Sequence, residues 1–225
     1  MKQRGDRLTQ LFLFCGILAP PVMMIAILVI GQITPNYDPI SDSISRMGTP
    51  DKPYAMILHG SYFIYGILIV MATCGLYRIM DLTNNVKKIT ILLGIHAVGI
   101  VLLAIFPDSI DSPYKHVIHD VMSATCYLPL LLSILVFRGI TRYRSILRAL
   151  DVLALSIIVI NLPMPIINIV SFLKPIGGLL QRFLIGTSFL WLTLIFYLLY
   201  RKDYLFREAE TRLNQGILTL ESASR

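Results

Sequence analysis

Two histidines and three carboxylates lie within a stretch of thirteen residues near the middle of the sequence. His116 and His119 are spaced by about one helical turn, and two imidazoles at that spacing can bind the same metal ion. A carboxylate of Asp108, Asp111 or Asp42 would complete a zinc site that activates water for hydrolysis. The sequence thus makes His116 and His119 candidate zinc ligands and, with Asp108, candidate catalytic residues.

The same side chains allow two other interpretations. A histidine and an aspartate act in many enzymes as a general base and its orienting partner, without a metal. Alternatively, His116 and His119 lie at a membrane surface and hydrogen-bond neighbouring helices or lipid headgroups, with no chemical role. The pair alone does not decide among the three, so the cofactor, zinc or none, is open at this point.

A helix that begins near Pro113 would carry His116, His119, Asp120 and Ser123 at offsets of zero, three, four and seven residues. Residues at these offsets lie on one helical face. We therefore expect the four side chains to line up just below a membrane interface.

Six apolar segments would position these residues. Each is long enough to cross the roughly 30 Å hydrocarbon core as a helix, which satisfies its backbone hydrogen bonds internally. Phe106-Pro107 ends the third segment, because proline lacks a donor and disfavours helical backbone before it. The expected fold is an all-α polytopic bundle of six transmembrane helices, at residues 11–33, 54–78, 89–106, 117–137, 149–173 and 179–200.

The distribution of positive charge predicts the orientation of this bundle. Fifteen of the twenty Lys and Arg residues precede the first segment, follow the sixth, or lie in the second and fourth connections. This alternation is what the positive-inside rule predicts for an even number of spans with both termini in the cytoplasm. We expect residues 1–10 to be a cytoplasmic N-terminus, residues 11–200 the transmembrane domain, and residues 201–225 a polar cytoplasmic tail.

The composition excludes several classes of protein. With 56% hydrophobic and only 15% charged residues, the chain is too apolar for an ordinary soluble domain. The net charge of +7 comes from clusters at the ends of apolar segments, so no nucleic-acid partner is expected. Asp, Glu, Lys and Arg are missing from the central part of every predicted span, which argues against an ion-driven transporter. The expected partners are membrane lipids.

Distinctive polar residues gather in the connections on the sparsely basic side of the membrane. In the first connection, Asp42 or Ser43 would cap a short interfacial helix, and Gly48 would end it. Arg182, near the start of the sixth span on the same side, is suited to pair with a phosphate or a loop carboxylate. We assign a role in substrate binding to five residues: Tyr37, Ser43, Ser45, Arg46 and Arg182.

Two further features have both a structural and a functional interpretation. His59 lies about one turn from the outer end of the second span and would join His116 and His119 if the second and fourth spans pack together. His96 is nearer the middle of the third span, where a histidine that hydrogen-bonds across the bundle is expected. Prolines 163 and 165 should kink the fifth span, as in helices that line transporter sites, although membrane helices also tolerate proline structurally.

Three stretches taken together resemble the bacterial and archaeal six-helix membrane family catalogued as domain of unknown function 998. The resemblance spans nearly the whole chain and implies a multi-pass protein of a prokaryotic cytoplasmic membrane, but no activity. The stretches are Tyr37, Pro39 and residues 43–48 after the first span, residues 106–108 with His116 and His119 before the fourth, and Gly178, Gln181 and Arg182 before the sixth.

Two functions follow from these observations. In the first, an enzyme hydrolyses or modifies a lipid or lipid-linked substrate at the extracytoplasmic interface, with His116, His119 and Asp108 as catalytic groups and Arg182 on a phosphate. In the second, a non-catalytic protein binds or moves lipids, or serves as an accessory membrane protein, and the outer connections form a polar lid.

Overall fold

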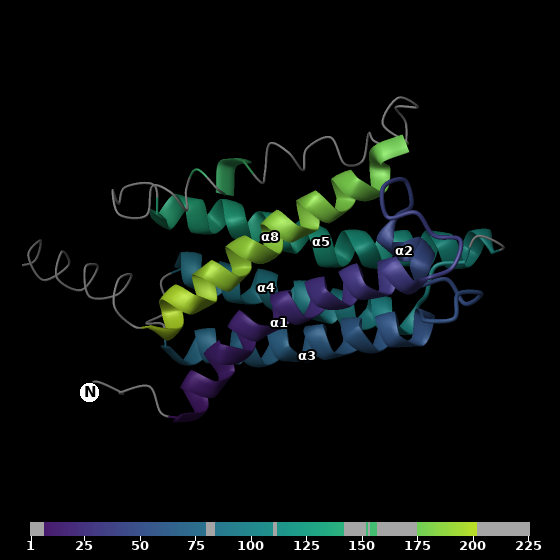
Figure 1. The fold of residues 1–225 in the computed structure, drawn as a ribbon. Coiled ribbons are helices and arrows are strands. Elements are labelled where there is room, and N and C mark those ends of the chain that lie inside the picture. Colours follow the sequence, from purple (N-terminus) through teal and green to yellow (C-terminus); the bar gives the residue numbers. More distant parts are fainter. Residues whose placement is uncertain are drawn as a thin grey trace, which may run out of the picture.

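The computed structural model describes residues 7–79, 84–109, 112–141, 152, 154–156 and 175–201, and every element named in this part of the chain is a helix. Five of these helices are long and apolar enough to cross a membrane, as in a multi-pass membrane protein. They are α1 (Arg7–Ile33), α3 (Ala55–Ile79), α4 (Asn84–Ile105), α5 (Pro113–Thr141) and α8 (Gly177–Tyr200). A four-residue helix, α2 (Ile44–Met47), lies between α1 and α3 (Figure 1).

Five of the six predicted spans are thus confirmed as long apolar helices, each within a few residues of its expected bounds. α4 ends at Ile105, as the Phe106-Pro107 pair predicts. The predicted fifth span, 149–173 with its two prolines, lies outside the described residues apart from 152 and 154–156, and so do residues 1–6 and the tail from 202 to 225.

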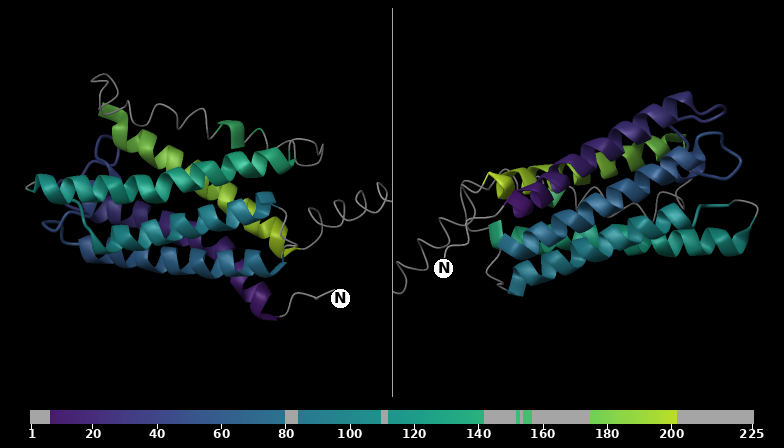
Figure 2. Two further views of the ribbon diagram at one scale, coloured as in Figure 1. Left: turned by 180° about the vertical axis from the view of Figure 1, so that it is seen from behind. Right: turned by 90° about the horizontal axis from the view of Figure 1, so that it is seen from below.

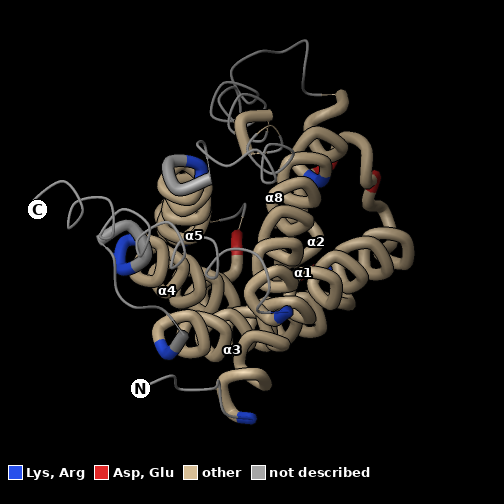
Figure 3. Tube along the Cα trace, turned by 90° about the vertical axis from the view of Figure 1, so that its left-hand side faces the viewer, with Lys and Arg blue, Asp and Glu red and all other residues tan. Residues whose placement is uncertain are grey.

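The five long helices follow one another around an open arc in the order α8, α1, α3, α4, α5, each packed on the next. Figure 2 shows this arrangement from behind and from below, with α1 beside α8 and α4 beside α5. In the view along the bundle in Figure 3, α5 and α8 form the two ends of the arc. The inner faces of the helices therefore enclose a common core.

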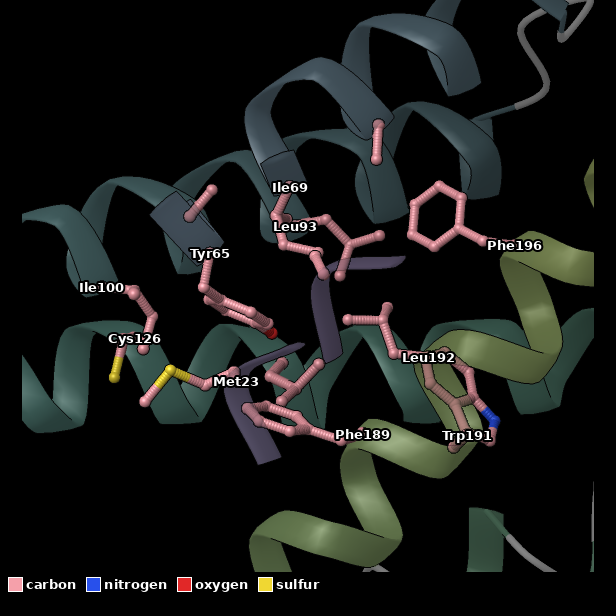
Figure 4. Packing of buried hydrophobic residues seen from close by; sticks show 14 of the residues in the cluster. Met23, Tyr65, Ile69, Leu93, Ile100, Cys126, Phe189, Trp191, Leu192 and Phe196 are labelled. Atoms are coloured by element: carbon pink, nitrogen blue, oxygen red, sulfur yellow. The ribbon is translucent and has the colours of Figure 1, made fainter. Parts of the chain in front are cut away.

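Aromatic side chains fill the middle of this core (Figure 4). The ring of Tyr65 on α3 stacks on Phe189 of α8 with 5.0 Å between the ring centroids. Phe137 of α5 meets Trp191 of α8 edge to face at 5.5 Å. Such pairs add roughly 0.5–1.5 kcal/mol each to the free energy gained from burying their area. They join helices that lie far apart in the sequence.

The two ends of the bundle differ in charge. Arg78 and Arg138 lie in the last turns of α3 and α5, and Arg201 follows α8. Figure 3 looks onto this end and shows the blue positions gathered there. We call it the basic end, and we call the opposite end, which carries α2, the α2 end.

Glycines allow close packing where the helices meet. A Cβ atom at Gly99 of α4 would lie 2.8 Å from the Cα atom of Cys126 on α5, which is closer than real Cβ contacts. Membrane helices use small residues at such interfaces because van der Waals packing drives their association. Gly94 lies on the same helix, and a Cβ atom there would meet nothing within 4 Å.

We predict that Gly99→Ala lowers the thermal unfolding midpoint of the detergent-purified protein, because α4 and α5 must separate to admit the methyl group. Overpacking of this kind costs about 1–3 kcal/mol. Gly94→Ala is the matched control and should leave the midpoint unchanged or slightly raised. Equal midpoints for the two variants would contradict the described packing of α4 on α5.

Candidate functional site

The short helix α2 is the centre of the polar structure at the α2 end. Ser43 precedes it as the N-cap residue in an extended conformation and Gly48 follows it as the C-cap, which confirms the short helix predicted between them, although the Ser43 side chain makes no capping hydrogen bond. Ile44 and Met47 are buried in the hydrophobic core. Ser43 and Arg46, two of the predicted substrate-binding residues, are exposed.

Two membrane-crossing helices bind the two ends of α2. Gln181 of α8 accepts the backbone N–H of Ile44 on its Oε1 atom at 2.8 Å. His59 of α3 lies 2.7 Å from the carbonyl oxygen of Gly48 and must donate from Nε2, since a carbonyl oxygen only accepts. The position of α2 is therefore fixed relative to α3 and α8.

The buried guanidinium of Arg182 on α8 holds the chain that leads into α2. Its Nη1 atom donates to the carbonyl oxygens of Pro39 at 2.7 Å, Gly178 at 2.9 Å and Asp42 at 3.1 Å. Its Nη2 atom donates to the Tyr37 hydroxyl. A phosphate that bound Nη1 would have to displace one of these carbonyl oxygens, so the phosphate role of Arg182 stays a prediction.

Tyr37 completes this anchor. Burial raises the pKa of its phenol, although the positive charge of Arg182 opposes the shift. The phenol therefore stays protonated and donates to the carbonyl oxygen of Ser43 at 3.0 Å. Arg182 also lies over the Tyr37 ring, 5.4 Å from its centroid.

Glycine is required where this loop meets α8. A Cβ atom at Gly178 would lie 2.8 Å from the carbonyl oxygen of Pro39 and would also collide with that of Asp42. The close approach allows the backbone N–H of Leu179 to donate to the carbonyl oxygen of Ile40 at 2.8 Å. The loop thus docks on the first turn of α8 through backbone as well as side-chain bonds.

The outward side of the loop is a local acidic network. Asp38 accepts the backbone N–H of Ile40 and the hydroxyl of Ser41, and these two bonds lower the pKa of its carboxyl group. Asp42 pairs with Arg46 at 2.6 Å. Arg46 therefore faces the surface, away from the buried side of α2.

His119 on α5 lies between a carbonyl oxygen and a hydroxyl. Its Nδ1 atom is 3.1 Å from the carbonyl oxygen of Phe106, and its Nε2 atom is 3.0 Å from Oγ of Ser45. The carbonyl oxygen can only accept, so Nδ1 carries the proton. In the neutral ring Nε2 then accepts the hydrogen of the Ser45 hydroxyl, which is the relation of a nucleophile to its general base.

The Phe106 carbonyl is available because α4 ends just before it. The last carbonyl oxygens of a helix have no partner within the helix, and Pro107 cannot extend it. They also carry the partial negative charge of the helix terminus, which favours a cation nearby. The Phe106 carbonyl at the end of α4 therefore fixes the orientation of the His119 ring.

A cavity of about 430 Å³ lies against this pair, between the inner faces of the helices. Ser45, His119 and Gln181 are among the residues that line it, and much of its wall is apolar, with Met23 and Ile27 of α1 among its residues. Its volume falls in the range of ~300–1,000 Å³ typical of small-molecule sites, which are likewise apolar with a few polar groups. The cavity would suit an apolar chain whose polar end lies at Ser45.

The residues predicted to share one face of α5 divide into two pairs. His119 and Ser123 both line the cavity. His116 lies on the outside, with Nδ1 2.8 Å from Asp108 and Nε2 3.6 Å from Asp120. The four positions span an arc of roughly 100° on an ideal helix. His119 and Ser123 lie on the part of this arc that faces the cavity, and His116 and Asp120 lie on the part that faces outward.

This division bears on the predicted zinc site. Both ring nitrogens of His119 have protein partners, and His116 pairs with carboxylates on the other side of the wall. In the described part of the chain, no group of three or more His, Cys, Asp and Glu side chains could hold a metal ion. Asp111 lies outside that part. The described residues therefore do not fit a zinc ion bound by His116 and His119 together.

His96 has the structural role that its place in the sequence predicts. Its Nδ1 atom is 2.6 Å from the carbonyl oxygen of Cys126 on α5, and its Nε2 atom is 2.9 Å from the Tyr65 hydroxyl on α3. Both ring nitrogens are thus satisfied across the bundle, as expected. The hydrogen bond of His59 goes to the end of α2, at Gly48, and not to His116 or His119.

Sequence reasoning found His119 and Ser45 separately but did not pair them, and it missed two partners. The Phe106 carbonyl has no side-chain signal, although the Phe106-Pro107 helix end indicates free carbonyl oxygens there. Gln181 was noted only as part of a motif. Of the predicted substrate-binding residues, only Ser45 lines the cavity; Tyr37 and Arg182 form the anchor, and Ser43 and Arg46 face outward.

A protein-family model with the description "Protein of unknown function (DUF998)" matches residues 17–197, which includes most of α1 and nearly all of α8. No curated protein and no solved structure matches the chain.

We predict that Arg182→Lys loosens the loop and α2. A lysine ammonium cannot reproduce the planar set of bonds to carbonyl oxygens and phenol, and each buried acceptor left unsatisfied costs about 1–3 kcal/mol. Amide hydrogen exchange of residues 37–48 should become faster. Arg201→Lys is the matched control, because Arg201 also lies over a tyrosine ring but is exposed. Unchanged exchange in Arg182→Lys would mean that the guanidinium does not hold the loop.

Proposed function

We propose, from the premise that this chain belongs to the DUF998 family, whose function is unknown, that it is a membrane enzyme that cleaves or transfers the acyl group of a lipid. Ser45 is the nucleophile and His119 its general base. The observation that carries this proposal is the placement of His119 between the Phe106 carbonyl and the Ser45 hydroxyl at the wall of an apolar cavity.

The geometry supports an acyl-transfer step in which atoms and protons balance. The Ser45 oxygen attacks the carbonyl carbon of the acyl group, and its proton passes to Nε2 of His119. When the tetrahedral intermediate collapses, His119 returns that proton to the departing alcohol and the acyl group stays on Ser45. Water or a second alcohol, deprotonated by His119, then attacks the acyl carbon, and His119 returns that proton to the Ser45 oxygen as the acyl group leaves.

A backbone carbonyl orients His119 as the base. During the reaction its ring becomes a cation that donates to the Phe106 carbonyl, which directly follows α4. A carbonyl carries no full charge, so we expect slower turnover than with a carboxylate in that place.

The predicted roles of the other catalytic candidates change accordingly. His116 is exposed beside the site and Asp108 is buried next to it, and their contact would hold the segment that carries Phe106. We assign them to positioning rather than to proton transfer. Arg182 and Tyr37 act in the same way, by holding the loop that carries α2.

Non-catalytic lipid binding is the second candidate function, and the apolar cavity favours it as well. On that account the bond between Ser45 and His119 only fixes α2 as the cover of a lipid site. The prolines that suggested an opening in the fifth span lie outside the described residues.

The topology that goes with the enzyme proposal has six spans, both termini in the cytoplasm and the site at the extracytoplasmic face of a prokaryotic cell membrane. Both α5 and α8 begin at the α2 end and finish at the basic end (Figure 1). A further span, for which the apolar residues 149–173 are long enough, would join them. The concentration of Lys and Arg at the basic end supports its cytoplasmic location.

An alkyl fluorophosphonate tests the enzyme proposal without knowledge of the natural substrate. The probe bonds covalently through phosphorus to an activated serine oxygen and releases fluoride. We predict labelling of Ser45 in the purified protein, detected by mass spectrometry of the peptide. Ser45→Ala should abolish it, and His119→Gln should slow it by about 10²–10⁴-fold, the usual contribution of a general base.

Ser61→Ala is the control, because the Ser61 hydroxyl donates to the carbonyl oxygen of Ile57 on its own helix and Ser61 is not among the described residues that line the cavity. It should be labelled at Ser45 like the wild type. A folded wild-type protein that stays unlabelled at Ser45 would exclude the enzyme and favour lipid binding.

A further inference from the structure

Gln181 lines the cavity, and one hydrogen bond determines the orientation of its side-chain amide. The backbone N–H of Ile44 can only donate, so it bonds the oxygen of the Gln181 amide and determines which way that amide points. The Nε2 atom then faces away from Ile44. Gln181 lines the cavity, and within the described residues its Nε2 atom has no hydrogen-bond partner. A ligand in the cavity could supply the hydrogen-bond acceptor that this amide nitrogen lacks.

The wall of the cavity carries no full charge. Among the described residues that line it there is no Lys, Arg, Asp or Glu. Arg182, one residue beyond Gln181, points away to the loop carbonyl oxygens. An anion enclosed in this cavity would lose its hydration without a cation to replace it, which costs several kcal/mol. The cavity therefore favours an uncharged ligand.

Gln181 is also close to the reacting atom. It bonds Ile44, the residue that directly precedes Ser45, so the amide and the Ser45 hydroxyl lie on neighbouring parts of one wall. If the carbonyl carbon of a ligand lay at the Ser45 hydroxyl, the carbonyl oxygen would lie near the Nε2 donors of Gln181. Neutral amide donors of this kind stabilise the oxyanion of acyl transfer in other enzymes.

We propose that Gln181 binds the carbonyl oxygen of an uncharged carboxylic ester and that the site therefore takes acyl esters and not phosphate esters. This inference rests on the proposed function. As the Ser45 oxygen adds to the carbonyl carbon, the C=O double bond becomes a C–O⁻ single bond, and the Nε2–H of Gln181 donates to that oxygen. The proton of Ser45 resides on His119 throughout this step.

A long-chain alkyl trifluoromethyl ketone tests this inference, since its carbonyl adds a serine oxygen reversibly and leaves an oxyanion. The full-length protein in phosphatidylcholine vesicles is incubated with the ketone and then labelled at Ser45 with the fluorophosphonate. The readout is the ketone concentration that halves labelling, measured within each variant. An alkyl phosphonate of equal chain length is the matched anionic ligand.

We expect the ketone to protect wild-type Ser45 and the phosphonate not to protect it. Gln181→Glu removes both donors but keeps an acceptor for the Ile44 N–H, so it should raise the half-protecting ketone concentration about 100-fold, the usual effect of one lost oxyanion donor. Its thermal unfolding midpoint should stay close to that of the wild type. Gln32→Glu makes the same chemical change at an exposed position near the α2 end and should leave protection unchanged.

The outcomes separate the two proposals. Equal ketone protection in Gln181→Glu and the wild type, or protection by the phosphonate as strong as by the ketone, overturns the role of Gln181 and leaves Ser45 as the nucleophile. A wild-type Ser45 that the fluorophosphonate does not label overturns both proposals.

Discussion

Burial of the Arg182 guanidinium constrains the whole α2 end of the bundle. A cation that is only 8% exposed must replace its lost hydration with hydrogen bonds. α8 itself provides one carbonyl oxygen, and the other acceptors come from the loop between α1 and α2. The loop therefore docks on the first turn of α8, where Gly178 leaves room for it. This docking brings Ile44 to Gln181 and Ser45 to His119.

The second half of the site depends on where a helix stops. Because α4 ends at Ile105, before Pro107, the carbonyl oxygen of Phe106 lies at its end and orients the His119 ring. The two halves come from segments 74 residues apart, since Ser45 is on α2 whereas His119 is on α5. The Ser45 hydroxyl and the His119 imidazole form their hydrogen bond where these two segments meet. The cavity beside the pair lies between helices that pack on one another in an arc.

The sequence predicted those parts of the structure that depend on local properties. The apolar segments gave five helices close to their observed bounds, the Ser43 and Gly48 signals gave α2, and the mid-span position of His96 indicated its bonds across the bundle. The sequence did not predict whether a residue faces the cavity or the outside of the bundle. His116 was therefore grouped with His119, although His116 faces outward and His119 faces the cavity. It could not assign partners to Arg182 either, because backbone carbonyl oxygens have no residue-specific signal. The orientation of Gln181 likewise depends on a backbone N–H 137 residues away.

The proposed chemistry requires that His119 holds its proton on Nδ1 and offers Nε2 to Ser45. Solid-state NMR of the ¹⁵N-histidine-labelled protein in lipid bilayers measures this directly, with His119→Gln used to assign the signal among the four histidines. We expect a neutral ring that is protonated at Nδ1, with an Nε2 resonance that shifts when Ser45 is replaced by alanine. A ring protonated at Nε2, or one whose resonances do not respond to Ser45→Ala, would contradict it, because His119 would then have no free electron pair for the serine proton.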